Sequence, residues 1–244
     1  MINNKPIIGV LLDWQENGSF SKRPHYALRQ AYFDAISWAG GVPIGLAYDE
    51  AHKQDYLSLI DGMLCPGGNF ASPAEWYVAG EETPYAPSPR AKYEVRLIKD
   101  ALDKGVPVLG ICGGMQVMGA AFGCKFTGDL HKYYGTDIDH KKGTPATEFA
   151  FDVTIKSGTK LHDIVGSDTM QVNAAHREAV VEHPHNVIIS AKNHIGVVEA
   201  LEIPAYDFAI GVQWHPEFFT TDDKGEPGHG KIFKALIAAA TDGT

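Results

Sequence analysis

A cysteine among glycines is the residue of this sequence with the clearest chemical potential. Cys112 lies in the segment Gly110–Gln116, between apolar runs at 106–109 and 117–122 that we interpret as a buried strand and a packed helix. The glycines allow a sharp turn with strained backbone angles, and free N–H groups at the start of a helix favour a thiolate. A free cysteine is usually a small buried core residue. The strand-to-helix setting nevertheless predicts that Cys112 is a nucleophile.

An imidazole and a carboxylate follow about a hundred residues after this thiol. His215 and Glu217 lie in the segment Gln213–Glu217, directly after the apolar run 208–212. A thiol nucleophile needs a base that takes its proton and a carboxylate that holds this base in the right tautomer. We therefore predict that His215 is the base and that Glu217 orients it, although a carboxylate at this position could also cap a neighbouring element.

The elements that must position these residues alternate between strands and helices in the first half of the chain. The expected strands are 7–12, 42–47 and 62–65, and the expected helices are 26–38, 49–60 and 90–104. This alternation predicts an α/β fold with an open, mostly parallel, twisted sheet that carries helices on both faces. Short β-like runs after residue 127 predict an additional small antiparallel β section. The closing helix is expected at 229–241.

Two loops are expected beside the nucleophile. Pro66-Gly67-Gly68 ends the strand at 62–65, and substrates of open α/β sheets bind at such strand ends. The long segment Asn69–Pro89 is rich in proline and aromatic residues, among them Trp76, Tyr77 and Tyr85. Long loops of this kind are usually functional or disordered, and the aromatic content favours an ordered flap over the site.

Length and composition limit the classes of protein that this chain can be. Its 244 residues, 44% hydrophobic and 21% charged, predict one soluble domain spanning residues 1–244. A net charge of −9 disfavours binding to nucleic acid or to an anionic membrane. Three cysteines without paired spacing indicate a reduced, cytoplasmic compartment. Without a compact ligand cluster outside the Cys-His-Glu set, we expect no metal and no cofactor.

The pattern G-x-C-x-G-x-Q at 110–116 with a late His-Pro-Glu resembles the class I glutamine amidotransferase superfamily. More narrowly, the chain resembles the γ-glutamyl-γ-aminobutyrate hydrolases. The landmarks that carry this resemblance are 6–10, 39–43, Pro66–Gly68, Val172-Asn173, His176 and 198–200. The resemblance covers nearly the whole chain. It implies a flavodoxin-like fold and a triad of Cys112, His215 and Glu217.

The resemblance also implies roles for residues around the triad. The backbone N–H of Gly113, directly after the nucleophile, would stabilise the oxyanion together with that of Gly68, which we favour over Gly67. Gln116 would bind the γ-glutamyl part of the substrate. The residues expected to line the substrate site are Gly67, Gln116, Asn173, His176 and Arg177.

The chain departs from the family pattern at three places. Gly113 stands where the hydrolase branch commonly has arginine, Ala174 replaces a serine, and Arg177-Glu178 replaces a histidine-glutamine pair. These departures leave the chemistry in place and concern the choice of substrate. We hypothesise that Arg177 supplies the missing cation and binds a substrate carboxylate through a bidentate contact.

These features together predict a cysteine hydrolase that cleaves the γ-glutamyl amide of a small molecule to glutamate and an amine, through a glutamyl thioester. The expected substrate is similar to γ-glutamyl-γ-aminobutyrate. One alternative is a glutaminase subunit that supplies ammonia to a partner synthetase. The other is a non-catalytic binding or regulatory protein on the same fold. The sequence leaves the formation of a homo-oligomer open.

Overall fold

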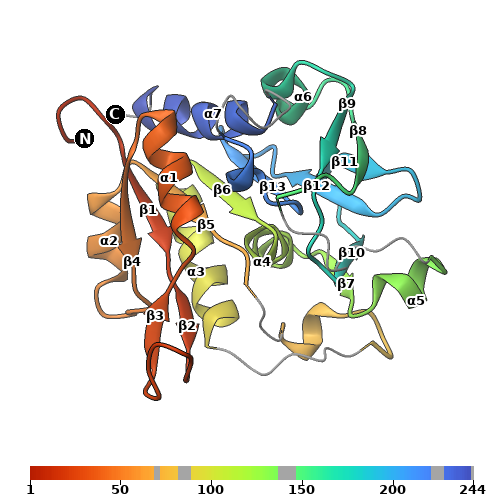
Figure 1. Ribbon diagram of the computed structural model, residues 1–244, viewed down its shortest axis with the longest axis horizontal. Coiled ribbons are helices and arrows are strands. Elements are labelled where there is room, and N and C mark those ends of the chain that lie inside the picture. Colours follow the sequence, from red (N-terminus) through yellow and green to blue (C-terminus); the bar gives the residue numbers. More distant parts are fainter. Residues whose placement is uncertain (69–71, 82–88, 137–146, 221–227, 243–244) are drawn as a thin grey trace.

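A nine-stranded sheet forms the centre of the computed structural model, which describes residues 1–68, 72–81, 89–136, 147–220 and 228–242 (Figure 1). The strands in spatial order are β4 (Val42–Leu46), β1 (Ile7–Leu11), β5 (Gly62–Cys65), β6 (Val108–Ile111), β13 (Ala209–Val212), β12 (Val198–Glu202), β11 (Ile188–Asn193), β8 (Phe151–Ile155) and β9 (Thr169–Val172).

The first five strands of this order pair in parallel, and the remaining pairs are antiparallel. Strands β12 and β8 consequently run against the other seven. The predicted mostly parallel α/β sheet is confirmed. Its antiparallel part continues the same sheet, and β7 (Lys125–Thr127) with β10 (Ala179–Glu182) and β2 (Asp13–Gln15) with β3 (His25–Ala27) form two small antiparallel pairs beside it.

Helices cover both faces of the sheet (Figure 1). On one face lie α1 (Gln30–Ala39), α6 (Lys160–Val165) and α7 (Gly228–Asp242), and on the other lie α2 (Lys53–Leu59), α3 (Arg90–Asp103) and α4 (Gly113–Ala121). The side chains of strand β1 pack on both faces of the sheet. Ile8 and Val10 lie on the face covered by α1, α6 and α7, and Ile7 and Leu11 lie on the other. A strand buried on both faces needs apolar side chains in every position.

Some elements differ from their predicted bounds. The helix expected from residue 26 begins at Gln30, because residues 25–27 pair as strand β3 with β2. The helix expected from residue 49 begins at Lys53. The Asp49 carboxylate accepts hydrogen bonds from the backbone N–H groups of Ala51 and His52, the two residues that precede the helix. Such side-chain bonds compete with the helical pattern. The sequence analysis missed β7, β10, α6 and α5 (Leu130–Tyr134), which are too short to show a periodicity.

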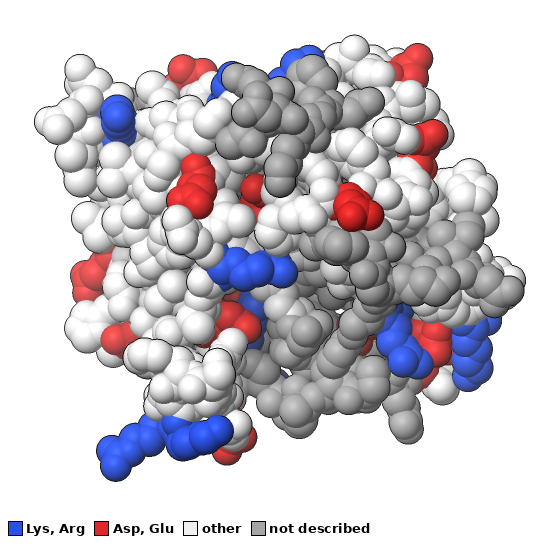
Figure 2. Space-filling model, in the orientation of Figure 1, with Lys and Arg blue, Asp and Glu red and all other residues white. Residues whose placement is uncertain are grey.

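Two surface features bear on the expected partners. No helix in the described part of the chain is long and apolar enough to cross a membrane. On the face shown in Figure 2, the basic side chains of the described residues are scattered and interspersed with acidic ones.

Candidate active site

The candidate site lies where three neighbouring parallel strands end. Pro66–Gly68 follows β5, Cys112 follows β6, and His215 comes three residues after β13. The carboxyl ends of parallel strands meet at one edge of a sheet, so segments far apart in the sequence converge there. A cavity of about 660 Å³ opens at this edge, and its walls include the following residues: Asp13, Trp14, Gln15, Arg29, Tyr32, Gly67, Gly68, Cys112, Ala175 and His215.

Cys112 occupies a strained turn between β6 and α4. Its φ of 51° and ψ of −107° are unusual for a residue with a side chain. The strain lies on the cysteine itself, whereas the neighbouring glycines allow close packing. A Cβ on Gly114 would lie 2.0 Å from the carbonyl oxygen of Cys65, and one on Gly110 would lie 2.7 Å from the backbone of Gly114. The glycines thus let α4 start directly against β5 and β6, with Cys112 at its N-terminus.

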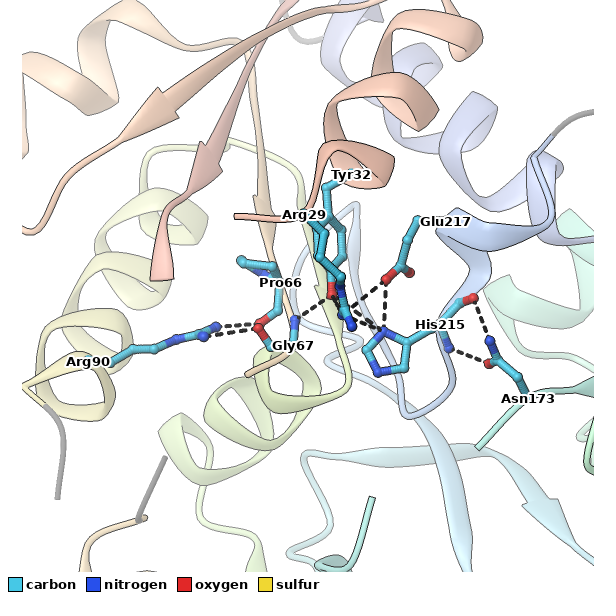
Figure 3. Close-up of polar contacts among 8 residues, drawn as sticks. All are labelled: Arg29, Tyr32, Pro66, Gly67, Arg90, Asn173, His215 and Glu217. Atoms are coloured by element: carbon cyan, nitrogen blue, oxygen red, sulfur yellow. Dashed lines mark hydrogen bonds and ion pairs between the residues drawn. The ribbon is translucent and has the colours of Figure 1, made fainter. Parts of the chain in front are cut away.

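His215 and Glu217 form a buried pair beside the thiol. The Nδ1 atom of His215 lies 2.8 Å from Oε1 of Glu217, and both side chains are buried. With Nδ1–H donating to the carboxylate, the Nε2 atom remains for the hydrogen bond between His215 and Cys112. The Asn173 side chain accepts the N–H of His215 at 2.7 Å and donates to its carbonyl at 3.1 Å. Asn173, expected at the substrate, therefore fixes the backbone of the base (Figure 3).

The charges of the site favour a thiolate and an imidazolium. Burial would lower the pKa of His215, but the negative charges of Glu217 and Cys112 outweigh it and raise the pKa to about 10. Burial would raise the pKa of Cys112, but the positive charge of His215 and its hydrogen bond outweigh it, so the pKa is lowered. The arrangement holds a nucleophilic sulfur beside a proton donor.

A second buried histidine contributes to this balance. His176 donates from Nδ1 to the carbonyl of Glu178 at 3.0 Å, and its Nε2 lies 3.6 Å from Oε2 of Glu199. Burial would lower the pKa of His176, but Glu199 outweighs it and the pKa is raised. The resulting positive charge also helps to lower the pKa of Cys112. Gln116 is buried too, and its Nε2 donates to Glu178 O and to Gln213 Oε1, both at 3.3 Å.

The loop Pro66–Gly68 places Gly67 and Gly68 in the wall of the cavity. The N–H of Gly67 donates to the hydroxyl of Tyr32 at 3.0 Å, and the same hydroxyl accepts from Nη2 of Arg29 at 2.8 Å. Gly113 is the first residue of α4, so its N–H belongs to the four helix donors without a partner inside the helix. Gly68 and Gly113 as the oxyanion donors stay a prediction.

Arg177, Trp76 and Tyr77 lie outside the wall of this cavity. Nη2 of Arg177 donates to Oδ2 of Asp129 at 2.6 Å, a different partner from the substrate carboxylate expected for it. Trp76 packs against Phe126, and the buried Tyr77 donates to Glu178 Oε1 at 2.8 Å. Tyr85 lies outside the described residues, together with the rest of 82–88, residues 69–71 and residues 137–146.

Three residues of the site were missed by the sequence analysis. Arg29 lines the cavity with its Nη2 atom 3.5 Å from Glu217 Oε1, and its guanidinium lies 5.3 Å from the ring centres of both Tyr32 and Phe218. Tyr32 was interpreted only as part of an apolar helix face. Arg90 was interpreted only as the start of a helix, although its side chain contacts the loop after β5. Nothing in their local sequence marks the contacts of Arg29 with Glu217 and of Arg90 with the loop after β5, which are long-range.

Among the described residues, no group of three His, Cys, Asp or Glu side chains could hold a metal ion. The arrangement brings the Cys112 thiol, the His215–Glu217 pair and the loop Pro66–Gly68 together at one cavity. These are the parts needed for acyl transfer through a covalent intermediate.

This fold and this site define a class I glutamine amidotransferase-like protein. The family model for Peptidase C26 matches residues 6–217, and the chain belongs to that family. It is 32% identical to the glutamine amidotransferase-like protein RP404 of Rickettsia prowazekii, covering 98% of this chain and 99% of the relative. It is 26% identical to the γ-glutamyl-γ-aminobutyrate hydrolase of Escherichia coli K12, covering 91% of this chain and 89% of the relative.

Solved structures show the same architecture at lower identity. The glutaminase domain of a Trypanosoma brucei CTPS with bound acivicin superposes with a TM-score of 0.60 at 16% identity, over 98% of this chain and 94% of that one. This likeness supports the fold of the chain.

Proposed function

We propose that this protein is a cysteine hydrolase that cleaves γ-glutamyl amides. The observation that carries the proposal is the buried contact of Cys112 with His215, whose other ring nitrogen is held by Glu217 at 2.8 Å. The similarity to a γ-glutamyl-γ-aminobutyrate hydrolase supports the substrate class, with γ-glutamyl-γ-aminobutyrate as the first compound to test.

In the proposed reaction, the Cys112 thiolate attacks the γ-carbonyl carbon, and the carbonyl oxygen becomes an oxyanion beside the N–H groups of Gly68 and Gly113. The imidazolium of His215 gives its proton to the leaving nitrogen as the C–N bond breaks. A water molecule then loses a proton to His215 and attacks the thioester, which releases glutamate and regenerates the thiol. Glu217 keeps the Nδ1–H tautomer of His215 in place throughout.

A panel of γ-glutamyl amides, scored for released glutamate, tests this proposal. The panel contains γ-glutamyl-γ-aminobutyrate, glutamine and γ-glutamyl amides with neutral amines, and Cys112→Ala provides the blank. Glutamate release from the larger amides is the expected result. Hydrolysis of glutamine alone would favour the glutaminase alternative. A chain that releases glutamate from no member of the panel would contradict the proposed activity.

A further inference from the structure

A buried arginine holds the loop that carries Gly68, one of the two expected oxyanion donors. Arg90 is the first residue of α3, and its side chain is 0% exposed. Its Nη1 donates to the carbonyl of Gly67 at 3.0 Å, and its Nη2 donates to the carbonyl of Pro66. Figure 3 shows Arg90 on one side of this loop and Tyr32 on the other. One planar group therefore fixes two successive peptide carbonyls.

Because the peptide bond is planar and trans, this contact also determines the direction in which the N–H groups of the loop point. In a trans peptide, the C=O of one residue and the N–H of the next point in opposite directions. Since both carbonyls point at Arg90, the N–H groups of Gly67 and Gly68 must point away from it. The Gly67 N–H does so, because it reaches the Tyr32 hydroxyl on the opposite side of the loop at 3.0 Å. The same constraint directs the Gly68 N–H away from Arg90.

The side opposite Arg90 is the side of the nucleophile. Gly67 and Gly68 line the cavity together with Cys112 and His215. A Cβ on Gly67 would lie 2.8 Å from Cε1 of His215 and 3.2 Å from Cβ of Cys112, so the loop lies against both catalytic side chains. Because Tyr32 already occupies the Gly67 N–H, Gly68 is left as the donor that this loop offers to a substrate.

We propose that Arg90 is a positioning residue that aims the N–H of Gly68 at the oxyanion formed on the substrate. The inference rests on the proposed acyl-transfer chemistry. We call the hydrogen bonds from Arg90 to the carbonyls of Pro66 and Gly67 the clamp, because they hold the loop in the orientation that this chemistry requires. Arg90 acts through the loop and touches no reacting atom.

The surroundings of Arg90 explain why an arginine stands at this position. Its Nε donates to Oε1 of Glu94 at 2.6 Å, and its Nη1 also reaches Oδ1 of Asp13 at 3.1 Å. These carboxylates compensate the buried charge, and the guanidinium fork has enough donors for both carbonyls as well. A lysine ammonium is a point charge and cannot reproduce this planar, multiple contact. Gly68 fits the same clamp, since a Cβ there would lie 2.1 Å from Nη1 of Arg90.

The test compares two reactions of Cys112 in the full-length Arg90→Lys variant. Alkylation by iodoacetamide forms a C–S bond and expels iodide without any oxyanion, so it reports the nucleophile alone. Acylation by p-nitrophenyl acetate forms a thioester and expels p-nitrophenolate through an oxyanion, so it also needs the N–H donors. Neither reagent carries a γ-glutamyl group. The matched control is Arg96→Lys, an exposed arginine on the same helix.

We expect the acylation rate of Arg90→Lys to fall at least about tenfold, within the loss of about 10² to 10³ seen when one oxyanion donor is removed outright. Its alkylation rate should stay within about twofold of wild type, and Arg96→Lys should change neither rate. Gly68→Ala should reproduce the selective loss, because its methyl group displaces the guanidinium. This second variant also keeps the test available if Arg90→Lys does not fold.

Acylation at the wild-type rate in both variants, or a parallel loss of alkylation and acylation, would overturn the clamp. A wild-type thiol that is alkylated but never acylated would overturn the oxyanion assignment itself. A wild-type protein that is acylated by the ester but cleaves no γ-glutamyl amide refutes the proposed substrate class, and it leaves the clamp to be decided by the variants.

Discussion

Replacing Glu217 by glutamine removes one negative charge beside the imidazole of His215, the proposed base, and keeps the shape of the side chain. Oε1 of Glu217 lies 2.8 Å from Nδ1 of His215, and the Glu217 side chain is 0% exposed. Two unit charges about 4 Å apart attract by about 4 kcal/mol at an effective dielectric constant of about 20. This energy corresponds to about 3 pKa units. The pKa of His215, which stands at about 10, should therefore fall to roughly 7 in Glu217→Gln.

The change at His215 carries over to the nucleophile. Burial would raise the pKa of Cys112, and this pKa is lowered mainly because the positive charge of His215 and its hydrogen bond outweigh burial, with a smaller contribution from His176. When the imidazolium of Glu217→Gln loses its proton near neutrality, the thiolate forms only at higher pH. The rate of iodoacetamide alkylation, measured by mass spectrometry of the Cys112 peptide, should fall at least about tenfold at about pH 8.5, between the His215 pKa of the variant and that of the wild type. The rates of variant and wild type should converge in alkaline solution.

A control separates this effect from a general change in charge. Glu182 is exposed on β10, so Glu182→Gln should leave the pH profile of alkylation unchanged. Alkylation rates of Glu217→Gln and wild type that coincide between about pH 7 and pH 10 would refute the reasoning that the Glu217 charge maintains the ion pair.

The remaining predictions concern the nucleophile, the base and the substrate. Cys112→Ala should abolish glutamate release, and an active Cys112→Ala would contradict the assignment of the nucleophile. Cys65→Ala and Cys124→Ala should retain most of the activity, because burial raises the pKa of both thiols, that of Cys124 to about 12. Asn173→Ala should lower kcat about 10- to 100-fold with little change in KM, since the backbone of His215 loses both side-chain contacts; a change confined to KM would instead place Asn173 at the substrate. Arg177→Ala should change KM for acidic and neutral γ-glutamyl amides alike, because Asp129 holds its guanidinium. A rise in KM confined to acidic substrates would restore the hypothesis that Arg177 binds a carboxylate.

The sequence was sufficient for the parts of the site that are local in the chain. The glycine-flanked Cys112 and the His-Pro-Glu segment each place their chemistry within a few residues, and apolar strands buried on both faces mark the parallel sheet. The contacts that hold these parts together are long-range. Tyr32 reaches the Gly67 N–H across 35 positions, and Arg90 reaches the carbonyl of Pro66 across 24. A periodic pattern shows that such residues lie on a helix, but it does not show what the side chain touches.

The geometry of the candidate site depends on the register of the parallel strands as much as on Cys112 and His215 themselves. Ile111 pairs with Val212, and the N–H of Cys112 donates to the carbonyl of Val212 at 2.7 Å, so the nucleophile and the base segment leave the sheet side by side. A slip of one residue between β6 and β13 would move Cys112 by about 3.3 Å relative to His215. Such a displacement would break a hydrogen bond that tolerates only a few tenths of an ångström.

Glycines in β6 and β13 let helix α4 pack closely against these two strands. A Cβ on Gly211 of β13 would lie 2.6 Å from Cγ of Met115 in α4, so the helix that begins directly after Cys112 rests on this strand. Larger side chains at this position would lift α4 and with it the strained turn of the nucleophile. The packing of α4 against the sheet and the alignment of Cys112 with His215 therefore depend on each other. A core substitution that disturbs the packing of α4 should reduce the proposed activity before it unfolds the protein.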